Sequence, residues 1–582
     1  MNNNTMNTEN NLAPAYNQND GVLMDYAEID FHGLKGLDQV DFQIRYHIKK
    51  TFSIIPERYH SDIAETYKRK HRNESPRDAN LYFLDLQDEI APSFNFSDNA
   101  LERKADRLAK TCHKIVKQDG IETGIRYAES QGIDQPTATT DTGIKNRLGC
   151  PVWWKRQLFK QQDREQEAFA LRIGIVGKYK QIYCSNAAHK RIHARQEKAL
   201  EIMARKEAVY GDDEEVINML DLLDSSLANP INRFAEIYTR AKGFEGYGND
   251  NGHTCQLITI TCPSRMHPSS NKYDGTTPRQ AQQYLSELWN RASTSFKDND
   301  IYPYGFRVAE AHADGCPHWH IWLFTPQDQQ SKLNSILEDH ALRVDGDEKG
   351  AEKYRIDFEA IDLSKGSASS YLFKYISKNL AGFGVGEDFE TDGQDASDTA
   401  PRVRSWASTW GIRQIQQVGG ASVGVWRELR RCKDELTGIM EKARIAAQAG
   451  DWKEYFEIQG GHKVPKYQHP IKVLKKINAD TETGEVELSY YDEPLERTKG
   501  LVCEGLEVIT RIKEWQIRDI ETENEISFEI IAGFDLLAMN PDNSIGAPFI
   551  YDDPEILPVY PFLKAKSASF SRPWNIRHNP RE

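Results

Sequence analysis

The spacing of hydrophobic residues divides the chain into a helical first part and a mixed second part. Residues 1–20 are rich in asparagine, which predicts disorder. Residues 21–245 have mainly helical patterning, clearest in 99–117 and 186–210, where apolar residues recur at helical spacing. The pattern therefore predicts a mainly helical N-terminal region.

Strands and helices alternate over residues 246–385, which we expect to form a separate core. The runs HTCQLITITCP (253–263), FRVAEAH (306–312) and HWHIWLF (318–324) are rich in β-branched or aromatic residues and are bounded by turn residues, which predicts strands. The pattern of apolar residues over 276–298 predicts a helix between the first two of these strands. An Asp-Gly turn precedes the third strand and allows the second strand to pair with it antiparallel.

The remainder of the chain changes character three times. Serines precede and a glycine follows a predicted helix at 366–384. Six acidic residues and no basic residue mark a linker at 386–400. A basic region rich in tryptophan and arginine, which we expect to be helical, covers 401–465, and short strand-like runs dominate the acidic region 466–582.

Composition excludes several classes of protein. The 582 residues are too many for one compact core. No apolar run approaches the roughly 18 residues of a membrane span, and the N-terminus lacks the order of charges of a secretory signal. The eight cysteines are scattered without a CxxC pair, which argues against a disulfide framework or a zinc ribbon and favours a cytoplasmic setting.

The net charge of −14 is unusual for a nucleic-acid-binding protein, but it is unevenly distributed. Residues 480–582 carry −11 of it, so the other residues together carry only −3. Residues 401–433 hold seven basic residues against one acidic residue and interleave arginines with Trp406, Trp410 and Trp426. Arginines with flat rings are typical of single-strand binding, although a solvated helix beside buried tryptophans gives the same pattern.

His318 and His320 are the first candidates for chemistry. They are two residues apart on a predicted strand, so both imidazoles point to one face and can supply half of a divalent metal site. The antiparallel strand before them places either Glu310 or His312 as a third ligand on that face. Two hydrogen-bonded core histidines would give the same spacing.

Tyr371, Tyr375 and Lys378 are the second set of candidates. At i, i+4 and i+7 they share one face of a predicted helix, where two hydroxyls and an ammonium group can converge. A buried tyrosine stripe is the structural alternative. Two histidines spaced to bind a metal ion, followed by a pair of tyrosines, suit a nicking-and-joining reaction. In such a reaction a tyrosine attacks a phosphodiester and the metal ion polarises that phosphodiester.

AEAHADGCPHWHIWLF (309–324) with YLFKYISKNL (371–380) resembles the HUH endonucleases and, more closely, the replication gene A proteins of temperate tailed bacteriophages. Other stretches also resemble this family, among them LITITCPSRMHP (257–268) and WASTWGIRQIQQVGG (406–420). The resemblance implies an α+β fold: an HUH core with a central antiparallel sheet flanked by helices. It also implies a rolling-circle replication initiator that cuts one DNA strand, keeps a 5′-phosphotyrosyl link and leaves a 3′-OH primer.

The resemblance assigns roles to single residues. His318, His320 and Glu310 would bind Mg²⁺ or Mn²⁺, Tyr371 and Tyr375 would be the nucleophiles, and Lys378 would assist at the phosphate. We also expect DNA contacts from five residues: Arg265, Lys272, Trp406, Trp410 and Arg413.

The resemblance also implies partners and a place of action. The partners would be single-stranded or locally melted origin DNA and the host replicative helicase and polymerase, in the cytoplasm of a bacterial host, with no membrane. An HUH transposase or relaxase, or an inactive DNA-binding regulator, is the alternative.

Overall fold

The structure is a computed structural model, and it describes residues 55–89, 96–211, 215–361, 367–370, 372, 376, 396–479, 484–513 and 515–520. The chain forms two compact units. Unit 1 comprises Met1–Pro136 with Leu148–Ile175, and unit 2 comprises Thr137–Arg147 with Val176–Glu582. No helix among the described residues is both long and apolar enough to cross a membrane.

Unit 1 is built from helices, as the sequence predicts. Its longest pair, α4 and α7, pack against each other. α4 begins after the cap Ser97, whose side chain accepts a hydrogen bond from the Ala100 amide, and buries apolar residues at helical spacing. The bounds are η4 (Glu57–Tyr59), α2 (His60–Asn73), α3 (Pro76–Glu89), α4 (Asp98–Asp119), α5 (Ile121–Ser130) and α7 (Pro151–Arg172).

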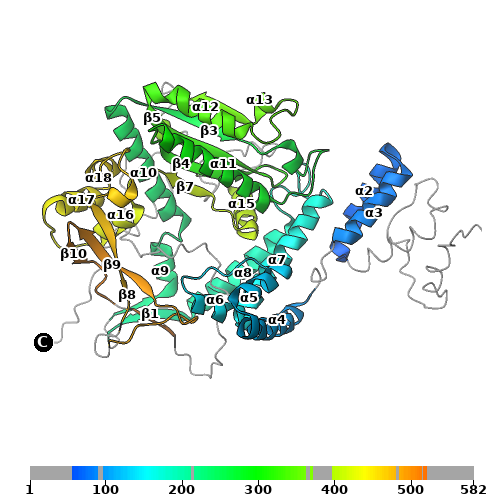
Figure 1. The fold of residues 1–582 in the computed structure, drawn as a ribbon, viewed down its shortest axis with the longest axis horizontal. Helices are drawn as coiled ribbons and strands as arrows, with labels where there is room; N and C mark the ends of the chain where they lie inside the picture. The colour runs from blue at the N-terminus through cyan, green and yellow to red at the C-terminus, as the bar shows by residue number, and fades with distance from the viewer. Residues whose placement is uncertain are drawn as a thin grey trace, which may run out of the picture. The chain divides into compact units, whose positions relative to one another are not determined.

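The centre of unit 2 is a five-stranded antiparallel sheet with the strand order β6-β3-β5-β4-β7 (Figure 1). The strands that the sequence predicts at 253–263, 306–312 and 318–324 are its three central members. The bounds are β3 (His253–Ile260), β4 (Tyr304–Ala311), β5 (Pro317–Pro326), β6 (Ile356–Ala360) and β7 (Ile415–Val418). The α+β class with an antiparallel sheet is confirmed.

Helices cover both faces of this sheet because successive side chains of each strand point to opposite faces. Phe306, Val308 and Trp322 point to one face and belong to a single buried cluster with Phe244 of α10 (Pro230–Asp250). On the other face, α11 (Pro278–Asp298) packs against β5, and the Trp319 indole donates to its Gln282 side chain at 2.9 Å (Figure 1).

The position of α10 differs from the sequence-based division at residue 245. The two compact units divide at Ile175, and α10 belongs to the unit that holds the sheet. Its buried residues fill the cluster on the sheet, so the helix is part of the core. The helix predicted over 186–210 also ends early, because residues 206–210 form strand β1.

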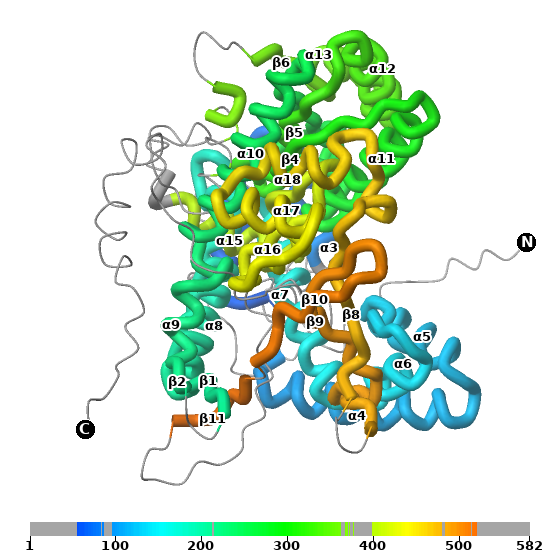
Figure 2. Tube along the Cα trace, turned by 90° about the vertical axis from the view of Figure 1, so that its left-hand side faces the viewer, coloured from blue at the N-terminus to red at the C-terminus, as the bar shows by residue number. Residues whose placement is uncertain are grey.

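Two smaller sheets complete unit 2 (Figure 2). β8 (Ile471–Ile477), β9 (Glu496–Cys503) and β10 (Leu506–Ile509) form one, in the order β10-β9-β8, and α16 packs on it. β11 (Gln516–Asp519) pairs with β1 (Lys206–Tyr210), which also pairs with β2 (Glu215–Asn218). The strand-rich character predicted after 466 is therefore confirmed as far as the described residues extend.

The remaining elements of unit 2 are mainly helical. The basic region predicted to be helical at 401–465 holds helices, but residues 415–418 within it form the edge strand β7. Their bounds are α6 (Asp141–Leu148, which ends in unit 1), α8 (Asn186–Ala204), α9 (Met219–Ser225), η5 (Ser264–Met266), η6 (Gln327–Gln329), α12 (Gln330–Ala341), α13 (Ala351–Tyr354), α15 (Ala396–Trp410), α16 (Val423–Arg431), α17 (Gly438–Ala449), α18 (Trp452–Ile458) and η7 (Lys466–Gln468). Residues 1–20, and most of the predicted linker 386–400, lie outside the described residues.

Candidate metal centre

A tight turn between β4 and β5 sets the register of the candidate site. The His312 amide donates to the Cys316 carbonyl at 2.8 Å, and the Gly315 amide donates to the His312 carbonyl at 2.8 Å. Gly315 has a φ of +83°, a conformation that glycine adopts without steric cost. The resulting pairing places Glu310 directly opposite His318.

Three side chains converge on one face of this hairpin. The Nε2 atoms of His318 and His320 lie 2.9 Å apart. The Glu310 Oε2 atom lies 3.3 Å from the His320 Nε2 and 3.7 Å from the His318 Nε2. Glu310 and His318 are buried and His320 is partly buried, so the three donors form an enclosed cluster beside the hydrophobic core.

The cluster has the spacing that a divalent ion requires. Donors about 2.1 Å from one ion, at angles of about 90° to 109°, are about 3.0 to 3.4 Å apart. The observed separations of 2.9, 3.3 and 3.7 Å bracket that range. Two imidazoles and one carboxylate therefore fit a metal ion, and because they are only three donors they leave coordination positions for a substrate.

Glu310 is favoured over His312 as the third donor. Among the described residues, the group of donor atoms close enough to share an ion consists of Glu310, His318 and His320. His312 instead stacks on His318, with ring centroids 3.9 Å apart and an interplanar angle of 27°. Its ring therefore braces one face of the His318 imidazole.

Thr259 supports the second histidine from the neighbouring strand. It lies opposite His320 in the β3–β5 pairing, and its Oγ1 is 3.0 Å from the His320 Nδ1. When Nε2 faces a metal ion, Nδ1 carries the proton and donates to the hydroxyl. This contact fixes the ring orientation of His320.

Asp314 anchors the turn through its buried carboxylate. Its carboxylate accepts hydrogen bonds from the Ser269 hydroxyl at 2.6 Å and the Cys316 amide at 3.1 Å, and lies 3.4 Å from the His267 Nδ1. Burial alone would raise the pKa of Asp314, but the contacts with His267, Ser269 and Cys316 outweigh burial and hold the pKa below its usual value. The turn before His318 is thereby held by a charged group.

Tyr371, Tyr375 and Lys378 lie outside the described residues. Their described neighbours Leu372 and Ile376 are helical and fully buried, and both belong to the hydrophobic cluster that contains Val308. Val308 is opposite His320 in the sheet, two residues before Glu310. Leu372 and Ile376, the described neighbours of the two tyrosines in the sequence, therefore lie on the sheet face that carries the candidate metal donors.

A carboxylate on α10 binds two residues that precede Leu372 in the sequence. Glu245 accepts hydrogen bonds from the Ala368 amide at 2.6 Å and from the Ser369 hydroxyl at 2.8 Å. An acceptor at the beginning of a helical turn satisfies amides that the helix leaves unpaired. α10 thus holds Ala368 and Ser369 in place.

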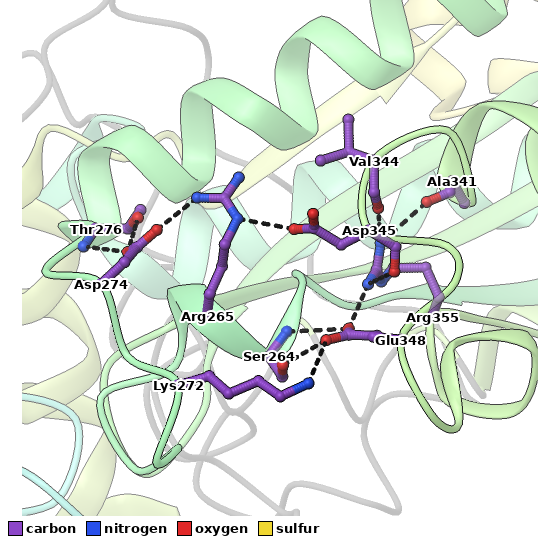
Figure 3. Close-up of polar contacts among 10 residues, drawn as sticks. All are labelled: Ser264, Arg265, Lys272, Asp274, Thr276, Ala341, Val344, Asp345, Glu348 and Arg355. Carbon is purple, nitrogen blue, oxygen red and sulfur yellow. Dashed lines mark hydrogen bonds and ion pairs between the residues drawn. The ribbon is translucent and has the colours of Figure 1, made fainter.

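Two of the predicted DNA contacts belong to a network of ion pairs (Figure 3). The Arg265 guanidinium donates to Asp274 at 2.5 Å and to Asp345 at 2.8 Å. The Lys272 ammonium lies 3.9 Å from Glu348, which also accepts from Arg355 at 2.6 Å. Arg265 therefore joins two loops through its ion pairs, and Lys272 remains mostly exposed beside them.

The two predicted tryptophans are core residues, which corrects the expectation that their rings present faces to DNA bases. Trp406 and Trp410 are 0% and 2% exposed. The Trp406 indole donates to the Gly315 carbonyl at 2.8 Å, so it supports the turn before the histidines. Arg413, the fifth predicted contact, is exposed.

Sequence reasoning missed Thr259 and Asp314. Thr259 lies in the run LITIT, where only the pairing of β3 with β5 identifies its partner. Asp314 was visible as part of an Asp-Gly turn, which gives no sign that its carboxylate is buried.

Comparisons with known proteins agree with the motifs. Residues 93–383, half of the chain, match the family model "Bacteriophage replication gene A protein (GPA)". The chain is similar to the replication gene A protein of Escherichia phage P2, with 34% identity over 64% of this chain and 51% of that protein. It is 36% identical to the probable replication protein P12 of Pseudoalteromonas phage PM2, over 58% of this chain and 55% of that protein.

A third relative carries an activity in its name. It is a probable replication endonuclease from a prophage-like region of Salmonella typhi, 30% identical over 62% of this chain and 48% of that protein. The chain spans about half the length of these curated relatives. No solved structure matches it.

Proposed function

Because the chain belongs to the bacteriophage replication gene A protein family, we propose that it initiates DNA replication by nicking one strand at an origin. Tyr371 and Tyr375 are the nucleophiles in this proposal, Lys378 assists at the phosphate, and His318, His320 and Glu310 hold Mg²⁺ or Mn²⁺. The bound ion supplies a Lewis acid that polarises the scissile phosphodiester. Mn²⁺ accepts imidazole donors more readily than Mg²⁺, so we expect it to bind more tightly.

One observation carries the proposal. The three donors lie on the sheet face against which Leu372 and Ile376 pack, and each of these residues directly follows one of the two tyrosines in the sequence. A nucleophile that attacks a phosphate held at the donors has to come from an element on that face. The buried anchors Leu372 and Ile376 support that placement.

The proposed reaction is a transesterification. The phenolic oxygen of one tyrosine attacks the scissile phosphorus as its proton leaves, and the bond from phosphorus to the 3′ oxygen breaks. The 3′ oxygen takes up a proton, so the products are a 3′-OH primer and a 5′-phosphotyrosyl link. The second tyrosine repeats the exchange when the new strand is cut and the displaced strand is rejoined.

The names of the relatives favour this proposal over the alternatives. They are called replication proteins or replication endonucleases, which favours an initiator over a transposase or a conjugative relaxase. The intact donor cluster favours an active enzyme over a decayed DNA-binding regulator. The proposed partners are single-stranded or melted origin DNA and the host replicative helicase and polymerase, in the bacterial cytoplasm.

The test is the formation of a covalent adduct. The full chain is incubated with Mn²⁺ and labelled single-stranded oligonucleotides that tile its own gene, and SDS-resistant protein–DNA complexes are separated by electrophoresis. We expect an adduct at one sequence, lost in the Tyr371→Phe/Tyr375→Phe double variant and strongly reduced in His320→Ala. Tyr354→Phe, at an exposed tyrosine, is the matched control and should react like the wild type. Absence of any adduct, or an undiminished adduct in the double variant, would refute the proposal.

A further inference from the structure

A cluster of cations adjoins the metal centre along the edge of the sheet. β7 is an edge strand paired antiparallel to β4, with Val308 opposite Ile415, and the Ala309 amide donates to the Gln414 carbonyl at 2.7 Å. Arg413 directly precedes Gln414, so this exposed residue lies next to β4, the strand that carries Glu310. Arg413 therefore stands beside the strand that supplies one of the candidate metal donors.

Four further arginines meet close to this edge. α10 supplies Arg233 and Arg240, and α16 supplies Arg427 and Arg430. The Arg240 guanidinium donates to the Gln417 side chain of β7 at 3.0 Å and lies 5.4 Å from the centroid of the Phe306 ring. The cluster is thus tied to the strand that follows Arg413.

One buried carboxylate serves this whole group of cations. Glu236, only 3% exposed, accepts from Arg427 at 2.9 and 2.8 Å and lies 3.4 Å from Arg240. Its charge also acts on Arg233 and Arg430. Among the described charges that most shift the pKa values of these arginines and of Lys466, Glu236 is the carboxylate and the others are arginines.

The positive charges of this cluster repel one another, and the fold holds them together despite that repulsion. Burial and repulsion from the neighbouring arginines, Arg413 among them, together lower the pKa of Arg240 to about 10, although Glu236 opposes them. Lys466 extends the cluster from η7. Its side chain is exposed, but the protein packed around it, and then repulsion from Arg240 and Arg413, lower its pKa. A bound anion would relieve that repulsion.

The geometry points to a binding site for the phosphate backbone of single-stranded DNA, formed by Arg413, Arg233 and Lys466 with the Glu236 cluster behind them. Arg413 and Lys466 are exposed, and guanidinium groups are suited to phosphate oxygens. The inference deepens the proposed function, on which it rests: it gives the path by which the strand leaves the scissile position. Arg265 is a poorer candidate for binding phosphate than Arg413, because the Arg265 guanidinium is already bound to two carboxylates.

The experiment measures binding without cleavage. The full chain is titrated onto a fluorescent oligothymidylate in EDTA, and polarisation is recorded between 50 and 200 mM salt. Each phosphate contact on a single strand contributes about 0.7 to the salt slope, so Arg413→Gln/Lys466→Gln should lower the slope by about 1.4. Across that fourfold range of salt, the wild type should lose about 7-fold more affinity than the double variant.

Two further variants make the result specific. Arg413→Lys keeps the charge and should retain most of the slope. Lys475→Gln, at an exposed lysine paired with Glu496 at 3.3 Å, should bind like the wild type. An unchanged slope in the double variant, or an equal loss in Lys475→Gln, would overturn the inference.

The two proposals can fail separately. If the adduct forms but the salt slope of the double variant is unchanged, the backbone site is wrong and the nicking proposal stands. If the slope falls as expected and no adduct forms with any oligonucleotide, the binding site stands and the nicking proposal fails.

Discussion

Replacing Thr259 tests whether the sheet orients His320, one of the proposed metal ligands. The Thr259 Oγ1 lies 3.0 Å from the His320 Nδ1, across the pairing of β3 with β5. The substitution Thr259→Val removes this oxygen and keeps a β-branched side chain of similar size, so the strand should be unaffected. Thr259→Ser restores an oxygen and should restore binding.

The expected loss is about tenfold or more in affinity for Mn²⁺. In a metal-bound histidine, one ring nitrogen binds the ion and the other donates a hydrogen bond. Removing the acceptor of that hydrogen bond costs about 10- to 100-fold in metal affinity, which corresponds to about 1.4 to 2.7 kcal/mol. One net hydrogen bond in a protein contributes about 0.5 to 1.5 kcal/mol, which favours the lower end of that range. His320→Ala removes the donor itself and should have a larger effect.

Isothermal titration calorimetry with Mn²⁺ measures the effect directly, and thermal unfolding by circular dichroism checks that each variant is folded. Thr254→Val is the matched control, because Thr254 is on the same strand and bonds the Thr325 carbonyl at 3.3 Å, away from the donors. Equal affinity for wild type and Thr259→Val, with weaker binding by His320→Ala, would refute the orienting role. Equal losses in Thr259→Val and Thr254→Val would point to general damage to β3.

Three further predictions concern stability. Gly305→Ala should destabilise the fold by at least about 3 kcal/mol in urea unfolding, because a Cβ there would lie 1.9 Å from the Trp322 carbonyl oxygen. Glu236→Gln should cost about 3 kcal/mol near pH 7, because it leaves Arg240 and Arg427 buried without their counter-charge. Burial raises the pKa of Glu236, but these arginines outweigh burial and lower it, so the difference from wild type should shrink as the pH falls below about 4. Burial lowers the pKa of His462 to about 4, below the value of about 6.5 in the unfolded chain, so stability should fall from pH 7 to pH 4, and His462→Gln should flatten that dependence.

Each of these has an outcome that contradicts it. Gly252→Ala is the control for Gly305, because Gly252 has a φ of +66° with no neighbouring atom within 4 Å, and it should cost only about 1 kcal/mol. Equal losses in the two would mean that the contact with Trp322 is relieved without cost. A Glu236→Gln difference that grows in acid, or a His462→Gln profile parallel to the wild type, would show that these groups do not titrate as described.

The hairpin at the metal centre could be predicted because its determinants are local. Alternation places His318 and His320 on one face, and the Asp-Gly turn predicts the antiparallel return of the preceding strand. The choice between Glu310 and His312 could not be made from the sequence. Both residues come shortly before the turn in the sequence. Only the backbone hydrogen bonds of the turn determine which of the two side chains stands opposite His318.

The partner of α10 could not be predicted from its own residues. Helical spacing over 230–250 identifies a helix but not the surface on which it packs. The structure inserts Phe244 between the sheet and α18, with its ring 5.9 Å from Trp452. That contact joins residues about two hundred positions apart, which no local pattern encodes.

The tryptophan and arginine segment shows the limit of composition. Flat rings beside arginines are compatible with base stacking and with a core, and the burial of Trp406 and Trp410 decides for the core. The arginine that follows them, Arg413, remains exposed at the edge strand. Composition identified the residue types, and topology determined which of them can reach a ligand.

The acidic net charge and the proposed DNA site are compatible because screening shortens the range of each charge to about 8 Å at physiological salt. One acidic residue of the C-terminal region is neutralised in place: Glu493 lies 2.6 Å from an Arg147 nitrogen and accepts from the Thr139 amide at 2.7 Å. A phosphate at Arg413 would instead meet the cations that gather around Glu236. In this proposal, the sign of the charge near the candidate metal donors, and not the total of −14, determines whether a DNA strand is held there.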